Sequence, residues 1–241
     1  MANEWLNWLK IGVAIGTVLT AVICGTIVIR KNPRYWLNRF FTGFYLSGAI
    51  GFLFYTIYHI YGIYKPAIIP LMIIGHVFMN FGLSCLLQTE FILEHSSKEA
   101  MTFPYLALSG GLFLISCAGY VFTGIVTLDE TQYSNKIIDT HTNIYWQIIV
   151  NLYRLGVFLY IIIKYSIISK KAKGATKDKL RIFSISLVIA MGGIILNLAA
   201  GVIFSGYAEY SIEIVGMISF MVGLVVMLRA FLLKERVEQA E

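Results

Sequence analysis

The chain has 241 residues, of which 58% are hydrophobic and 13% are charged, and its mean hydropathy is +0.76. A soluble domain carries about 25% charged residues, so this composition excludes a soluble globular protein and indicates a membrane protein. The net charge of +6 does not indicate a nucleic-acid partner, because the basic residues flank apolar segments instead of forming one basic face.

Seven apolar segments are long enough to cross a bilayer, which takes about 20 helical residues. In chain order they span residues 9–29, 40–63, 68–92, 103–127, 143–166, 181–205 and 211–233. We therefore predict an all-α fold: a polytopic membrane protein whose single transmembrane domain, residues 1–241, is a seven-transmembrane-helix bundle. A short charged helical tail, residues 234–241, is expected to follow the last span.

The first segment is expected to remain in the mature protein as a helix. It follows Trp5 and Trp8, which suit a membrane interface, and it lacks the basic start and the small-residue cleavage site of a signal peptide. The three cysteines, Cys24, Cys85 and Cys117, lie inside apolar segments without metal-ligand spacing, so we expect neither a disulfide nor a structural zinc.

Residues 164–181 fix the predicted orientation. This stretch carries seven Lys or Arg and one Asp between two apolar segments, and short loops of this kind stay in the cytoplasm. With that loop inside, every Lys and Arg except Lys10, Lys65, Lys136 and Arg154 falls on the cytoplasmic side or at its boundary. We predict a multi-pass protein of the cell membrane with its N-terminus outside and its C-terminus in the cytoplasm.

Polar residues inside the spans indicate a candidate site, because such residues are expensive in a bilayer. Gln147, Asn151 and Arg154 recur at i, i+4 and i+7, which places them on one helical face. At about 1.5 Å per residue, the polar positions of four helices converge on one depth in the outer half of the bilayer. The candidate ligand-binding residues are His59, His76, Asn80, Gln147, Asn151, Arg154, Asn197 and Glu213.

Two interpretations of these residues remain open. Asn and His side chains also join membrane helices by hydrogen bonds, at about 0.6 kcal/mol each. Arg154 differs, because a permanent charge at mid-depth costs at least about 2.5 kcal/mol and needs a partner. That partner is either Glu213, in an ion pair, or a wet cavity, a cluster of carbonyls or an anionic ligand.

The sequence gives little support for a metal site, a haem site or an enzyme active site. His59 and His76 are the only histidines within the apolar segments; haem would require them to face each other, and zinc would require a third ligand. We expect no metal site and no cofactor. Phosphate-binding loops, nucleophile elbows and zinc-protease motifs are absent from the sequence, so we expect no enzymatic activity.

Seven spans with an outside N-terminus is also the plan of rhodopsins, of G-protein-coupled receptors and of the seven-helix sensor modules at the N-terminus of some prokaryotic histidine kinases. The segment from Gly216 to Gly223 has no Lys, which rules out a retinal Schiff base there, and the receptor signatures are missing. The chain resembles the kinase-linked sensor module in the stretch Asn32–Phe41, which opens a Tyr-rich second helix, over residues 30–95. This resemblance implies a receptor or sensor.

Our leading hypothesis is a membrane sensor that binds a small ligand, either anionic or neutral, in an outward-facing polar pocket and signals through its cytoplasmic loops and tail. Its expected partners are the lipid bilayer, an unknown small ligand, and a cytoplasmic signalling protein or a second copy of the chain. The alternatives are a small-molecule or ion transporter or channel, and a structural subunit of a membrane complex. Transport would need a polar path through the inner half, for which the sequence offers only Ser84, Gln88 and Glu90.

Overall fold

The computed structural model describes residues 4–60, 63–122, 124–134, 138–204 and 207–233. Over these residues the chain is helical apart from one small β-hairpin. The elements are α1 (Glu4–Lys31), α2 (Trp36–Tyr58), η1 (Lys65–Ala67), α3 (Ile68–His95), α4 (Ser97–Ala100), α5 (Phe103–Ala118), η2 (Gly119–Val121), β1 (Val126–Leu128), α6 (Glu130–Ser134), β2 (Thr140–Thr142), α7 (Ile144–Lys171), α8 (Gly174–Ile203) and α9 (Tyr207–Leu232).

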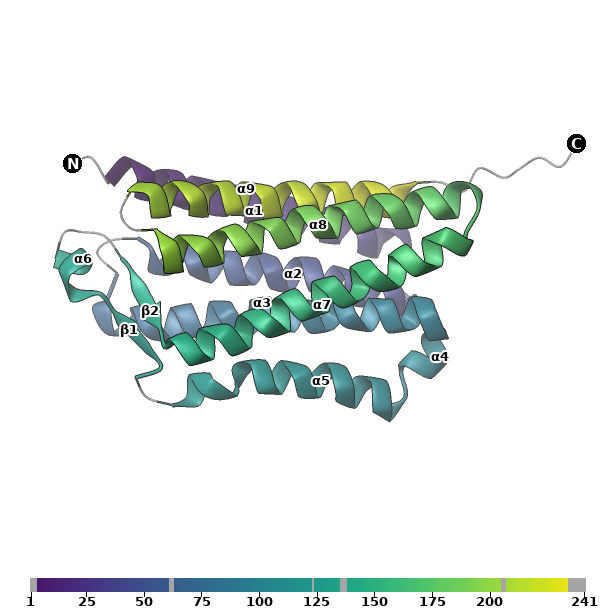
Figure 1. Ribbon diagram of the computed structural model, residues 1–241, viewed down its shortest axis with the longest axis horizontal. Helices are drawn as coiled ribbons and strands as arrows, with labels where there is room; N and C mark the ends of the chain where they lie inside the picture. Colours follow the sequence, from purple (N-terminus) through teal and green to yellow (C-terminus); the bar gives the residue numbers. More distant parts are fainter. Residues whose placement is uncertain (1–3, 61–62, 123, 135–137, 205–206, 234–241) are drawn as a thin grey trace, which may run out of the picture.

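Seven helices within the described residues are long and apolar enough to cross a membrane, which confirms the predicted all-α, seven-span fold. In Figure 1 the long helices lie side by side along one axis. Contacts run from α1 to α2, α3, α5, α7, α8 and α9 in turn and then from α9 back to α1, while α3 also contacts α7. The helices therefore form a closed ring around an interior that several of them share.

The two ends of the bundle differ in charge. The hairpin end carries β1, β2 and α6, and the opposite end, which we name the α4 end, carries α4 (Figure 1). The last turns of α1 and α7 at the α4 end hold Arg30, Lys31, Lys170 and Lys171. This asymmetry is the pattern from which the orientation was predicted; the side of the membrane on which each end lies remains a prediction.

Several helix boundaries differ from those expected. α1 begins five residues early, at Glu4, because its first turns extend beyond the apolar run. α5 ends at Ala118, although a helix to residue 127 was expected. Gly124 adopts a positive φ of 81°, a conformation that stops a helix, and the β-branched residues that follow pair as β1 with β2 in antiparallel register, with Val126 opposite Thr142.

Other observed helix boundaries also differ from the expected ones, and some expected boundaries fall outside the described residues. α2 ends at Tyr58, before the expected residue 63, and the chain turns at His59. α7 continues to Lys171 and α8 begins at Gly174, so the basic loop between them is shorter than the stretch 164–181 suggested. Residues 61–62, residue 205 and the charged tail 234–241 lie outside the described part of the chain.

Close packing of α8 on α9 depends on glycine. A Cβ atom on Gly216 would lie 2.8 Å from the backbone oxygen of Gly193, and one on Gly193 would meet the backbone of α9 in return. Small residues permit this approach, and membrane helices gain van der Waals contact from it because lipid supplies little hydrophobic driving force between them. The two helices thereby form one wall of the interior.

Candidate functional site

A cavity of about 570 Å³ lies inside the ring, lined by α2, α3, α7, α8, α9 and the hairpin. At the hairpin end it reaches His141, which is exposed, so the cavity opens to solvent there. Its far end is formed by buried residues of α2, α3 and α7. Six of the eight candidate residues line it: His76, Gln147, Asn151, Arg154, Asn197 and Glu213.

α7 supplies the most polar wall of the cavity. The side chain of Asn143 accepts a hydrogen bond from the backbone N–H of Tyr145, at 3.1 Å, and so caps the first turn of α7. From this start the helical period carries Gln147, Asn151 and Arg154 along the face that lines the cavity. The opposite face of α7 carries exposed apolar residues such as Leu152, which is 66% exposed and suits contact with lipid.

Arg154 is held inside the bundle by two residues of α3. Its Nε donates to Oδ1 of Asn80 at 2.9 Å, and its Nη2 lies 2.8 Å from Nδ1 of His76. Because a guanidinium can only donate, Nδ1 of His76 must accept, which makes this imidazole neutral with its proton on Nε2. The imidazole also stacks on Tyr120, with ring centroids 5.8 Å apart at an interplanar angle of 20°.

These contacts leave the charge of Arg154 uncompensated. Both of its partners are neutral, and among the described residues no carboxylate pairs with it. In the same part of the chain, Nη1 of Arg154 has no hydrogen-bond partner, although the residue lines the cavity. A half-buried guanidinium with free N–H groups beside a cavity is suited to bind a carboxylate or phosphate oxygen.

Glu213 pairs with Lys10 of α1 and not with Arg154, so the structure does not form the ion pair considered above. The Lys10 side chain is 5% exposed and that of Glu213 is 24% exposed. Nζ of Lys10 also lies 4.8 Å from the ring centroid of Tyr210, a cation-π contact. The pair joins α1 to α9 and forms part of the cavity wall through Glu213.

Asn80 and His59 do not line the cavity. Asn80 is fully buried and, besides holding Arg154, donates from Nδ2 to the backbone oxygen of Ser116 in α5, at 3.2 Å. His59 directly follows the last residue of α2, and its Nδ1 lies 2.9 Å from the backbone oxygen of Tyr55. Burial, and then the charge of Lys10, lower the pKa of His59 well below its ordinary value, so this imidazole is neutral and donates to Tyr55.

The remaining amides bond within their own helices. Nδ2 of Asn151 donates to the backbone oxygen of Gln147 at 2.8 Å, and Nδ2 of Asn197 donates to that of Gly193 at 3.1 Å. Across the described residues, neither amide joins two helices. A role in joining helices therefore does not explain why these two amides lie on the cavity wall.

Helix joining is instead performed by a polar seam between α3, α5 and α7, defined by Ser84, Gln88, Ser109 and Tyr153. The Ser84 hydroxyl donates to the backbone oxygen of Ser109 at 3.0 Å and lies 2.8 Å from the Tyr153 hydroxyl. The Ser109 hydroxyl lies 3.0 Å from Oε1 of Gln88, to which it donates. Two of the three residues that the sequence offered for an inner polar path, Ser84 and Gln88, are thus engaged between helices.

Glu90, the third of those residues, is fully buried in α3. Neither of its carboxyl oxygens has a hydrogen-bond partner within the described residues. A charged carboxylate in such surroundings carries a large desolvation penalty.

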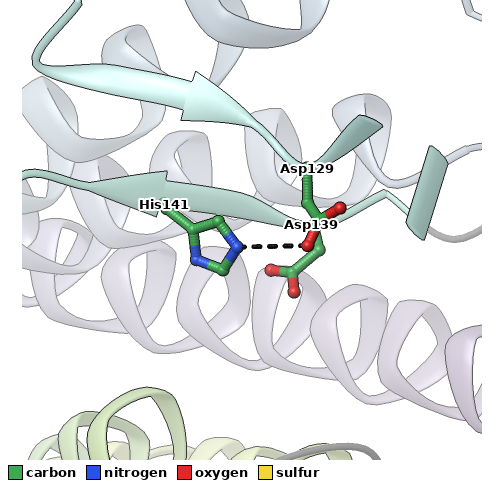
Figure 2. Close-up of side chains that lie close together, drawn as sticks. All are labelled: Asp129, Asp139 and His141. Carbon is green, nitrogen blue, oxygen red and sulfur yellow. Dashed lines mark hydrogen bonds and ion pairs between the residues drawn. The ribbon is translucent and has the colours of Figure 1, made fainter. Parts of the chain in front are cut away.

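Three side chains with metal-ligating atoms gather on the hairpin: Asp129, Asp139 and His141 (Figure 2). Their nearest ligand atoms all lie within 4.8 Å of one another, a spacing that could hold a divalent cation. Asp129 already has protein partners, since its Oδ1 accepts the backbone N–H groups of Thr131 and Gln132 and its Oδ2 lies 3.4 Å from Nε2 of His141. These contacts, that of Gln132 foremost, lower the pKa of Asp129 and stabilise the start of α6.

No protein-family model matches the chain, and no curated protein matches it either.

Proposed function

We propose that this protein is a membrane sensor that binds a small anion in the cavity through Arg154. What supports the proposal is one observation: a half-buried guanidinium on the cavity wall has no carboxylate partner among the described residues, and its Nη1 has no acceptor there. An anion there would supply the missing charge and acceptors, and a guanidinium can bind it through two parallel N–H donors.

In this proposal the hairpin end faces outside and the α4 end faces the cytoplasm. The basic last turns of α1 and α7 support that orientation under the positive-inside rule. The ligand would then enter past the hairpin, and the signal would leave through the α7–α8 connection or the tail after α9, toward a signalling protein or a second copy of the chain. The resemblance to kinase-linked sensor modules over residues 30–95 favours the same direction.

A route for the signal follows from the contacts of Arg154. An anion bound to Nη1 would attract the guanidinium, which also contacts Asn80 and His76 of α3. Asn80 in turn donates a hydrogen bond to the backbone of α5. Ligand binding therefore acts on the α3–α5–α7 side of the ring, where the polar seam fixes the relative positions of the same three helices. A ligand can shift this arrangement only by the difference between its affinities for two states.

Transport is the second candidate, and Glu90 is the observation that favours it. A buried acid between the cavity and the α4 end is a group through which proton movement could couple to transport. The engagement of Ser84 and Gln88 between helices favours sensing over transport, because neither then lines a continuous polar path.

The test is to measure binding and flux on one preparation. The full chain is purified, reconstituted in proteoliposomes, and screened with radiolabelled monocarboxylates and phosphate for binding and for uptake. We expect saturable binding without uptake, lost in Arg154→Met and kept in Lys98→Met, a control that removes an exposed positive charge remote from the cavity. Measured uptake would replace sensing by transport, and unchanged binding in Arg154→Met would refute the site.

A further inference from the structure

The cavity changes character beyond Arg154. We name as its inner end the part lined by Phe44 and Gly48 of α2, Gly82 and Leu83 of α3, and Phe158 of α7. Phe158 is fully buried, and Phe44 and Leu83 are 4% and 5% exposed. None of these five side chains can donate or accept a hydrogen bond, so the inner end offers contact only to apolar groups.

Positions along the helices place the inner end on the far side of Arg154 from the hairpin. Phe158 lies one turn beyond Arg154 on α7, about 6 Å further along the axis. Leu83 lies two turns beyond His76, which contacts Arg154, or about 10 Å. Phe44 and Gly48 of α2 lie at the same depth as Leu83, because they pack against its neighbour Gly82. A Cβ on Gly82 would lie 3.2 Å from the backbone oxygen of Phe44 and 3.7 Å from the backbone nitrogen of Gly48.

The opposite end of the cavity is acidic. Asp139 beside β2 and Glu209 of α9 line it there, and neither forms an ion pair in the described part of the chain. Glu213 also lines the cavity, but its charge is compensated by Lys10. A ligand with a second anionic group on its outer side would be repelled by these carboxylates, whereas one with a single negative charge at Arg154 would not.

We propose that the ligand is a water-borne organic monoanion whose carboxylate, or like group, binds Arg154 while an apolar chain or ring occupies the inner end. This inference rests on the proposed anion site and adds the ligand's shape, polarity and orientation. Burial of one CH₂ group tightens binding about fourfold, the equivalent of about 0.8 kcal/mol. Affinity is therefore expected to rise along the series acetate, butanoate, hexanoate until the chain fills the inner end.

Gly48 offers a specific perturbation of the inner end. It lines the cavity, and no atom lies within 4 Å of a Cβ built on it, so a side chain there enters the cavity without displacing the protein. Gly12 of α1 is a matched control, because its Cβ also meets no atom but the residue is exposed and does not line the cavity. The experiment compares wild type, Gly48→Leu, Gly12→Leu and Arg154→Met.

Binding of acetate, butanoate, hexanoate and hexylammonium is measured for each variant in nanodiscs of neutral lipid, with phosphatidylglycerol nanodiscs as a further arm. We expect hexanoate to bind wild type and Gly12→Leu at least tenfold more tightly than acetate, and Gly48→Leu to lose that preference while still binding acetate. Hexylammonium should not bind, and Arg154→Met should bind none of the carboxylates.

The outcomes separate this inference from the proposed function. Equal affinity for acetate and hexanoate in wild type, or a preference that survives Gly48→Leu, overturns the amphipathic ligand but leaves the anion site intact. Carboxylate binding that is unchanged in Arg154→Met overturns both the amphipathic ligand and the anion site. A further outcome concerns lipid: wild type binds hexanoate in neutral nanodiscs but not in phosphatidylglycerol nanodiscs, and Gly48→Leu shows no such dependence on lipid. That result would assign the inner end to a lipid chain and overturn the water-borne ligand.

Discussion

The buried pair of Lys10 and Glu213 allows a quantitative prediction. Glu213→Gln leaves Lys10, which is 5% exposed, without its counter-charge. Removing one partner of a buried pair costs about 3–5 kcal/mol, and we expect the lower limit, about 3 kcal/mol, because the ring of Tyr210 still faces the ammonium. Lys10→Met should cost less, about 2 kcal/mol, because the stranded Glu213 is 24% exposed and faces the cavity.

The double variant Lys10→Met/Glu213→Gln leaves no stranded charge, so its free energy of unfolding should lie within about 1 kcal/mol of wild type. The assay is unfolding of the four proteins in mixed micelles titrated with a denaturing detergent. Combined, the values predict a coupling energy of at least about 4 kcal/mol. The same cycle for Arg154→Met and Glu213→Gln should give a coupling near zero, and a small first coupling or a large second one would refute this assignment of partners.

Three further predictions concern other parts of the bundle. Gly193→Ala should destabilise the same unfolding transition by about 1–3 kcal/mol, since its Cβ meets the backbone of Gly216, whereas Gly192→Ala, with no atom within 4 Å of its Cβ, should not destabilise it. Because the folded state lowers the pKa of Asp129, the stability it gives the hairpin is complete above the unfolded pKa of about 3.9 and is lost as the pH falls toward the folded one. Hydrogen exchange at the start of α6, corrected for intrinsic rates, should therefore accelerate on acidification, and Asp129→Asn should abolish this pH dependence. Glu90→Gln should change the free energy of unfolding by less than about 1 kcal/mol, because neither carboxyl oxygen of Glu90 has a hydrogen-bond partner to lose within the described residues; a loss several times larger would mean that Glu90 is ionised and paired.

The helical period explains which site residues could be predicted. Gln147, Asn151 and Arg154 keep to one face, and the structure places all three on the cavity. His76 and Asn80 are also four residues apart, but each such step rotates by about 40° about the helix axis. This drift is enough to turn Asn80 from the cavity toward α5, where it bonds the backbone of Ser116.

Contacts between distant helices could not be predicted in the same way. The partner of Glu213 depends on α9 lying against α1, which is a property of the ring and not of either segment. Lys10 stands at the start of the first apolar segment, so the sequence assigned it to the outer side. Its spacing from Leu6 and Ala14, both buried, was the available signal that it faces inward. The hairpin was missed because strands of three residues leave little pattern in a sequence.

The central claim is that Arg154 binds an anion inside the ring, and a structure of the full chain with 6-bromohexanoate tests it most directly. We predict a carboxylate oxygen at hydrogen-bonding distance, about 2.7–2.9 Å, from Nη1 of Arg154. The anomalous signal of bromine should lie among Phe44, Leu83 and Phe158. A carboxylate bound at Lys10 or outside the ring, with Arg154 still holding only Asn80 and His76, would contradict it.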